Sequence, residues 1–148
     1  MTLLTLTVLI LGLFTGSLLT EAMILVPFWR SLKPETFLEH HSSMGPQLYK
    51  YFAPLTILAT VIPTITAAYC TWDSGEILTY PNLSSLLVLL ILGIYFLYFK
   101  AANESFATGS VGVDGLASEL RSWSTWHWIR TVMAMVAFGS ATLALFQV

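Results

Sequence analysis

Four long apolar stretches dominate this sequence and limit what it can fold into. A helix needs about 20 largely apolar residues, at 1.5 Å rise each, to cross the hydrocarbon core of a bilayer. The stretches cover about residues 3–29, 47–72, 83–102 and 119–147, and they meet or approach that length. We therefore predict an all-α fold, an integral membrane four-helix bundle with up-down-up-down topology, in which residues 1–148 form a single domain.

The composition explains why these stretches belong in a membrane. Of the 148 residues, 56% are hydrophobic and 9% are charged, whereas soluble domains carry roughly 25% charged residues. With a mean hydropathy of +0.77, the chain lacks the polar surface to cover a globule of this size, so apolar side chains must face lipid. This excludes an ordinary cytosolic enzyme and makes the lipid bilayer the first expected partner.

Charge and cysteine content exclude two further classes of protein. The formal net charge is -2 and no basic run occurs, so nucleic acid is not an expected partner. The single cysteine, Cys70, excludes an intramolecular disulfide and a CxxC redox pair. The other partners we expect are a hydrophobic small molecule and a second copy of the chain or a larger membrane complex.

The segments between the spans contain helix-breaking residues. The longest expected connector runs from Lys100 to Arg121, where Gly109 and Gly112 interrupt the helical pattern. A short separate helix is expected to begin at Pro34 and to be broken at Gly45-Pro46, before the second span begins.

All six basic residues fall on one side of the predicted topology. They are Arg30, Lys33, Lys50, Lys100, Arg121 and Arg130. The second connection carries Asp73 and Glu76 but no lysine or arginine, so the positive-inside rule predicts that both termini lie outside the cytoplasm.

Four tryptophans lie near the expected helix ends. Trp29 closes the first span, and Trp123, Trp126 and Trp128 open the fourth. Because tryptophan is enriched at membrane–water interfaces, we interpret them as belt residues and not as part of a cofactor site.

Glu21 is the residue of the first span whose insertion into a membrane costs the most free energy. It follows a long apolar run and precedes another, and an ionisable side chain at a helix centre costs on the order of 3 kcal/mol on insertion scales. Two interpretations remain open. Glu21 pairs with a lysine or arginine as a structural group, or it is a buried ligand, base or proton carrier.

Polar residues also flank the second and third spans on the same side. His40 and His41 precede the second span, and Asn103 follows the third. Adjacent residues on a helix point about 100° apart, so at most one of the two histidines should face the bundle.

A stripe of polar residues begins the fourth span. Glu119, Trp123, His127 and Arg130 are separated by four, four and three positions, so they share one helical face that continues into small residues. His127 should therefore point inward. It serves either in a functional site or as structural glue, hydrogen-bonded to Glu119 or Glu21.

The predicted topology brings these groups to one side of the membrane, in a polar pocket that opens toward the cytoplasm. The candidate catalytic residues are Glu21, His127, Arg130 and Asn103. Few partners exist at that depth, so we expect Glu21 to contact one of the histidines or a ligand that they share.

Two kinds of chemistry fit such a pocket, and the sequence does not identify a cofactor. A transition metal, iron or copper, could bind Glu21, His40, His41 and His127, although no Glu-x-x-His or His-x-x-x-His pair supports it. Haem fits less well, because the histidines lie near the surface. In the metal-free alternative, a buried histidine or glutamate abstracts a proton from an activated carbon acid or phenol.

Part of the sequence resembles a known family. The string Asn103-Glu104-Ser105-Phe106, followed by Trp123 and then His127-Trp128-Ile129-Arg130-Thr131, resembles the end of the anthrone oxygenase-like membrane proteins. Gly12, Gly16 and Pro27 are similar in placement, but Glu21 and His40-His41 match no family motif. The resemblance implies a four-helix membrane protein that oxidises anthrones to anthraquinones.

Two functional hypotheses follow. The first is a small membrane oxidoreductase, anthrone oxygenase-like, that acts on a hydrophobic aromatic or quinone-like substrate in the pocket. The second is a non-catalytic membrane subunit or small transporter, in which the same polar residues hold the bundle together or carry protons.

Overall fold

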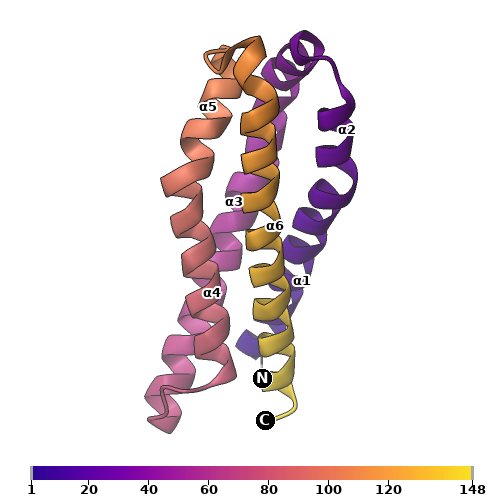
Figure 1. Cartoon of the computed structure of the whole chain (residues 1–148). Helices are drawn as coiled ribbons and strands as arrows, with labels where there is room; N and C mark the ends of the chain where they lie inside the picture. Colours follow the sequence, from indigo (N-terminus) through magenta and orange to yellow (C-terminus); the bar gives the residue numbers. More distant parts are fainter. Residues whose placement is uncertain (1, 148) are drawn as a thin grey trace.

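The computed structural model describes residues 2–147, which form four long helices with no strand among them (Figure 1). The first long helix comprises α1 (Thr2–Thr20), the π-helical segment η1 (Glu21–Leu25) and α2 (Val26–Ser31). The second is α3 (Pro34–Ser74). The third comprises α4 (Tyr80–Ile94), a second π-helical segment η2 (Tyr95–Phe99) and α5 (Lys100–Thr108), and the fourth is α6 (Gly112–Leu145).

Each of the four long helices is long and apolar enough to cross a membrane. Only about a third of the most apolar window of each helix is buried inside the molecule, so most of that apolar surface faces outward. The expectation of an all-helical chain with four long apolar helices is confirmed.

The two ends of the molecule differ in what they hold. Both termini lie at one end, together with the connection at residues 75–79 (Figure 1). The connections at residues 32–33 and 109–111 lie at the opposite end. We call the half that contains the termini the terminal half and the other the far half.

The prediction of a long connector from Lys100 to Arg121 is wrong. Residues 100–108 and 112–121 are helical, and only residues 109–111 lie between α5 and α6. The reversal is short because Gly109 and Gly112 have φ angles of 70° and 69°, a left-handed conformation that glycine adopts without steric cost. The flanking residues can then stay helical.

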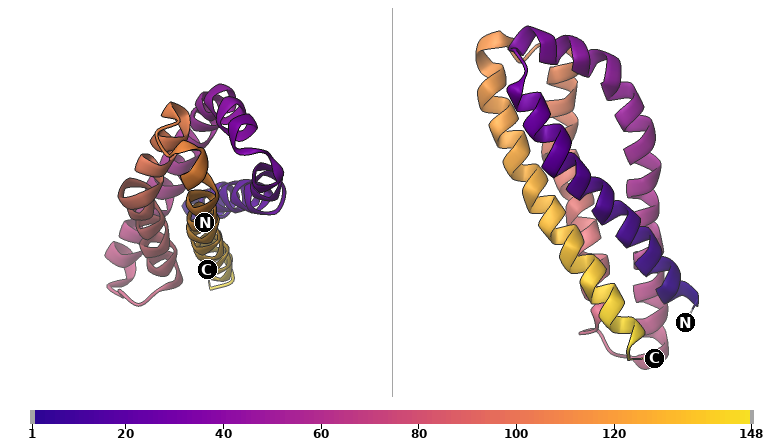
Figure 2. Two further views of the ribbon diagram at one scale, coloured as in Figure 1. Left: turned by 45° about the horizontal axis from the view of Figure 1, so that its top comes forward. Right: turned by 90° about the vertical axis from the view of Figure 1, so that its right-hand side faces the viewer.

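The expected break at Gly45-Pro46 is also wrong, because α3 is one helix from Pro34 to Ser74. Figure 2 (right) shows that its first turns run across the far end before the helix bends and descends. Pro46 removes one backbone hydrogen bond and crowds the preceding turn, which bends a helix without necessarily ending it. At the far end, the first turns of α3 pack against α5, where the ring centroids of Phe37 and Phe106 are 5.3 Å apart.

Two core clusters fill the bundle. The terminal-half cluster contains Leu11, Phe14, Leu18, Leu55, Ala59, Val88, Ile91, Ala134, Ala137 and Ala141. The far-half cluster contains Val26, Trp29, Phe37, Phe99, Ala102, Phe106, Leu116, Leu120 and Trp123.

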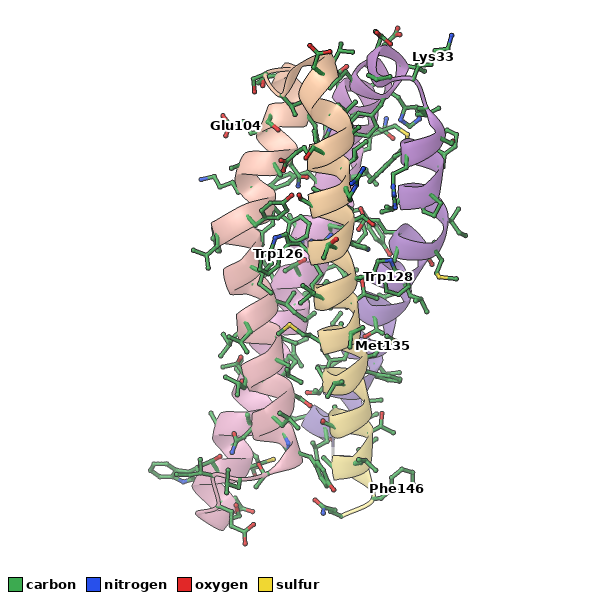
Figure 3. The ribbon with its side chains drawn as sticks, viewed as in Figure 1. Lys33, Glu104, Trp126, Trp128, Met135 and Phe146 are labelled. Atoms are coloured by element: carbon green, nitrogen blue, oxygen red, sulfur yellow. The ribbon has the colours of Figure 1, made fainter. Side chains whose placement is uncertain are left out.

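The prediction that the four tryptophans form an interfacial belt is wrong for two of them. Trp29 and Trp123 are buried, and their rings pack edge to face with centroids 5.7 Å apart. Trp126 and Trp128 lie on the outer surface (Figure 3). Position near a helix end did not separate the two pairs, because burial depends on tertiary contacts: Trp29 packs on Phe37 of α3, and Trp123 packs on Trp29 and Phe99.

Candidate functional site

Glu21, His127 and Arg130 form a buried cluster between the first and fourth long helices. Arg130 Nη2 lies 3.2 Å from Glu21 Oε2, and Arg130 Nε and Nη2 both donate to His127 Nδ1, at 3.0 and 2.7 Å. Glu21 Oε2 is also 3.6 Å from His127 Nδ1. This contact agrees with the expectation that Glu21 lies against a histidine, and we call the three residues the ion cluster.

The hydrogen bonds of His127 define its tautomer. Its Nε2 lies 2.9 Å from the carbonyl oxygen of Leu18, which can only accept, so Nε2 carries the hydrogen. Nδ1 then offers a lone pair to the two N–H groups of Arg130, and the imidazole is neutral. This assignment comes from the hydrogen-bond network. His127 therefore points inward, as expected, and holds the guanidinium in place.

Aromatic rings enclose the guanidinium. Arg130 Cζ lies 3.9 Å from the ring centroid of Phe99 and 5.5 Å from that of Trp123, within cation–π range. The Trp123 ring stacks on His127 with centroids 5.0 Å apart, and its Nε1 donates to Asn103 Oδ1 over 2.9 Å. The indole therefore links Asn103 to the ion cluster.

Both π-helical segments contribute to this site. Glu21 is the first residue of η1, and Phe99 is the last residue of η2. A π turn holds more residues than an α turn, which redirects the side chains on it, and such turns are frequent at functional sites. Nothing in the sequence pattern predicts either segment, and the role of Phe99 was missed for that reason.

A cavity of about 620 Å³ opens beside the ion cluster. Its polar wall includes Glu21, Arg130, Asn103, Lys100 and His41, and Trp29, Phe52, Tyr95 and Trp123 supply aromatic surface. His127 is not on the wall. Of the candidate catalytic residues, Glu21, Arg130 and Asn103 can thus touch a ligand, and His127 acts through Arg130.

A groove of about 470 Å³ also reaches Glu21. It lies between the first long helix and α3, whereas residues of all four long helices line the cavity. Glu21, Leu48 and Phe52 line both spaces.

The two adjacent histidines have different surroundings. The ring of His41 is buried among Trp29, Phe37 and Phe106, with centroid distances of 6.2, 5.4 and 5.4 Å, and it reaches the cavity wall. His40 lies half-buried beside Phe28 and is not on that wall. One histidine of the pair faces inward, as expected.

The expected metal site is not assembled. Within residues 2–147, no three or more His, Cys, Asp or Glu side chains converge as metal ligands, so Glu21, His40, His41 and His127 do not form one set. The physical reason is Arg130, whose guanidinium occupies His127 Nδ1 and Glu21 Oε2. Both nitrogens of His127 are taken, which also removes it as a haem ligand.

Glu119 belongs to a separate contact. Its Oε1 accepts a hydrogen bond from the Tyr98 hydroxyl over 2.8 Å, and its half-buried side chain does not line the cavity. Of the two partners considered for His127, Glu21 is the one that lies beside it.

Comparisons of the chain with known protein families, curated proteins and solved structures found no match.

Proposed function

We propose that this chain is a small integral membrane oxidoreductase, anthrone oxygenase-like, that oxidises a hydrophobic aromatic substrate in the cavity. One observation carries the proposal: a buried carboxylate and guanidinium, 3.2 Å apart, both reach the wall of an aromatic-lined cavity. The resemblance of residues 103–131 to the anthrone oxygenase-like family adds the class of reaction.

The cavity suits a flat ligand with a polar edge. Its volume of about 620 Å³ falls within the roughly 300–1,000 Å³ of small-molecule sites, which are mostly apolar with a few polar groups that fix orientation. Trp29, Phe52 and Trp123 supply the apolar wall. Arg130 supplies hydrogen-bond donors for a carbonyl or phenol oxygen. Asn103 accepts a hydrogen bond from Trp123, whose ring lies next to Arg130.

The ion cluster can activate a carbon acid without a metal. Glu21 removes a proton from the ring CH₂ group, which lies across the ring from the carbonyl and is conjugated with it through the flanking aromatic rings. Arg130 stabilises the negative charge that develops on the carbonyl oxygen. The enolate then reacts with O₂, and a hydroperoxide forms that loses water. In total, CH₂ and O₂ become C=O and H₂O.

The proposal places the protein in a membrane as an up-down-up-down bundle with both termini outside the cytoplasm, and it places the mouth of the cavity at the cytoplasmic side. Support comes from the basic residues flanking the far-end connections, such as Lys33 and Arg121. The test uses the Cys70→Ser protein with single cysteines at position 33 or 75. An impermeant external reagent should label position 75 only, and labelling of position 33 alone would reverse the orientation.

Oxidation of anthrone tests the activity. The purified chain in nanodiscs should consume O₂ and form anthraquinone, and Glu21→Gln should lower the rate by about 100-fold or more, as expected for loss of a general base. Glu39→Gln, at an exposed position outside the cavity, is the matched control. Full activity in a folded Glu21→Gln protein would overturn the role of Glu21.

The alternative is a non-catalytic subunit or small transporter. One observation favours it: Glu21 is reached from both the cavity and the groove, as a residue on a proton or solute path would be. The same purified protein separates the two functions. No O₂ consumption, together with Glu21-dependent proton uptake into vesicles, would support the transporter.

A further inference from the structure

We propose that the groove holds an alkyl chain of the substrate while the aromatic head occupies the cavity. The inference rests on the proposed function and narrows its substrate class to an amphiphile with a ring system and a long tail. The two spaces meet at Glu21, Leu48 and Phe52, so one molecule can extend from one into the other past these residues.

The chemistry of the groove matches a hydrocarbon. Ser17 Oγ is hydrogen-bonded to the Tyr51 hydroxyl and to the Leu13 carbonyl, each over 2.8 Å. Thr20 Oγ1 donates to the Gly16 carbonyl over 2.8 Å. Their polar groups are thus already engaged, and apart from Glu21 at the junction, the groove offers a ligand mostly apolar contact.

Gly16 leaves space at the floor of the groove, whereas a Cβ at Gly12 would meet the ring of Phe138 at 3.2 Å. A Cβ added at Gly16 would meet nothing within 4 Å, so the space above this residue is open. The groove follows α1 and η1 from Gly12 to Leu25, which corresponds to about 20 Å along the helix axis at 1.5 Å per residue. This length suits an extended chain better than a second ring system.

The outer wall of the groove faces the apolar surface of the bundle. Leu13 and Tyr51, which line it, are 57% and 51% exposed. The mouth of the cavity is different, because exposed Lys100 and Glu104 stand there. A hydrocarbon chain therefore has an apolar way out through the groove, and the polar mouth is left to water and O₂.

The groove selects which molecules can bind by its shape, and it adds little to their affinity. A chain that leaves lipid for the groove exchanges one apolar environment for another, so its transfer contributes little free energy. An open groove allows a tailed molecule to seat its ring in the cavity. A filled groove should exclude tailed molecules and leave tailless ones unaffected.

The experiment compares two probes on the full chain in nanodiscs: 2-methyl-1,4-naphthoquinone and 2-methyl-3-decyl-1,4-naphthoquinone. Binding is followed by quenching of Trp29 and Trp123, which line the cavity. Gly16→Leu should lower the affinity for the decyl probe by about tenfold, which is the size of an overpacking effect. The affinity for the tailless probe should not change. Leu13→Phe, at the exposed rim, should have the same selective effect.

Gly139→Leu is the matched control, because a Cβ at Gly139 also meets nothing within 4 Å and the residue lines neither space. It should bind both probes like the wild type. If Gly16→Leu and Leu13→Phe weaken the binding of both probes equally, or of neither, then the groove does not hold the alkyl chain and the inference is overturned while the proposed function stands. If the wild type binds neither probe, the head site itself fails, and the proposed function fails with it.

Discussion

The two halves of the bundle use the same four helices in different ways. In the terminal half, helices approach through small residues, and hydroxyl groups bond directly across them: Thr7 to Thr66, Thr15 to the Ala134 carbonyl and Ser84 to the Ala137 carbonyl. In the far half, an ion pair, large aromatic rings and two π-helical segments surround a cavity.

A small apolar bundle accommodates a polar site by packing its two halves differently. Close packing in the terminal half supplies the contacts that hold the helices together. The bend of α3 near Pro46 keeps the far half open, and the ion cluster lies near the boundary, where Leu18 of the terminal-half cluster receives the hydrogen bond of His127. The terminal half is held by close packing, and the far half holds a polar site whose buried charges must stay paired.

The largest effect should come from removing Arg130. Arg130→Ala leaves the buried Glu21 without its cationic partner, and breaking a buried pair in this way costs about 3–5 kcal/mol. Unfolding in SDS measures the loss. Arg121→Ala, at an exposed position, should change stability by less than about 0.5 kcal/mol. Equal effects of the two substitutions would show that the ion cluster contributes nothing special to the far half.

The next effect concerns η1. Deleting Met23, which is 61% exposed, should convert the π turn to an α turn and keep the bundle folded, but it should redirect Glu21. A displacement of about 1 Å can lower a rate by about 100-fold, and anthrone oxidation measures it. Deletion of Leu9 within regular α1 should instead lower stability. Full activity after deletion of Met23 would separate the π turn from function.

Overpacking the terminal half should have a smaller effect, and only on stability. Ala137 is fully buried among the helices, so Ala137→Leu should cost about 1–3 kcal/mol. Quinone binding in the cavity should remain that of the wild type. Val136→Leu, on the exposed face of the same helix, is the control. A loss of binding in Ala137→Leu would mean that the two halves are not independent.

The smallest effect should come from one hydrogen bond of the terminal half. Thr7→Val keeps the shape of the side chain but removes the 2.8 Å hydrogen bond between the hydroxyl groups of Thr7 and Thr66. Interhelical hydrogen bonds of this kind contribute about 0.6 kcal/mol on average. The SDS unfolding curve should therefore shift only slightly, and a shift as large as that of Arg130→Ala would contradict the division of roles between the halves.

The sequence predicted the parts of this structure that depend on periodicity and on the scarcity of charge. Spacing alone placed Trp123, His127 and Arg130 on one face of α6, and the cost of burial made Glu21 a partner for them. Continuity of helices was harder to predict. Pro46 and Gly109 are both helix-breaking residues, yet α3 continues through Pro46, whereas α5 ends at Gly109, which has a φ angle of 70°.

The parts of the site that the sequence did not predict depend on tertiary contacts. Phe99 reads as one more apolar residue of the third span, and only the π turn brings it against Arg130. His40 and His41 look equivalent in the sequence, but the path of α3 across the far end places only His41 at the cavity. The metal site predicted from Glu21 and the histidines was wrong for the same reason. No rule of sequence spacing shows that Arg130 binds both Glu21 and His127.

The ion cluster also has a consequence for how the chain is made. Glu21 and Arg130 are 109 positions apart, in the first and the fourth of the long helices. Glu21 is therefore synthesised well before the arginine that pairs with it, and an unpaired buried carboxylate is costly. We expect Glu21 to stay protonated or solvated until α6 has been made, so the ion cluster closes late in the assembly of these four helices.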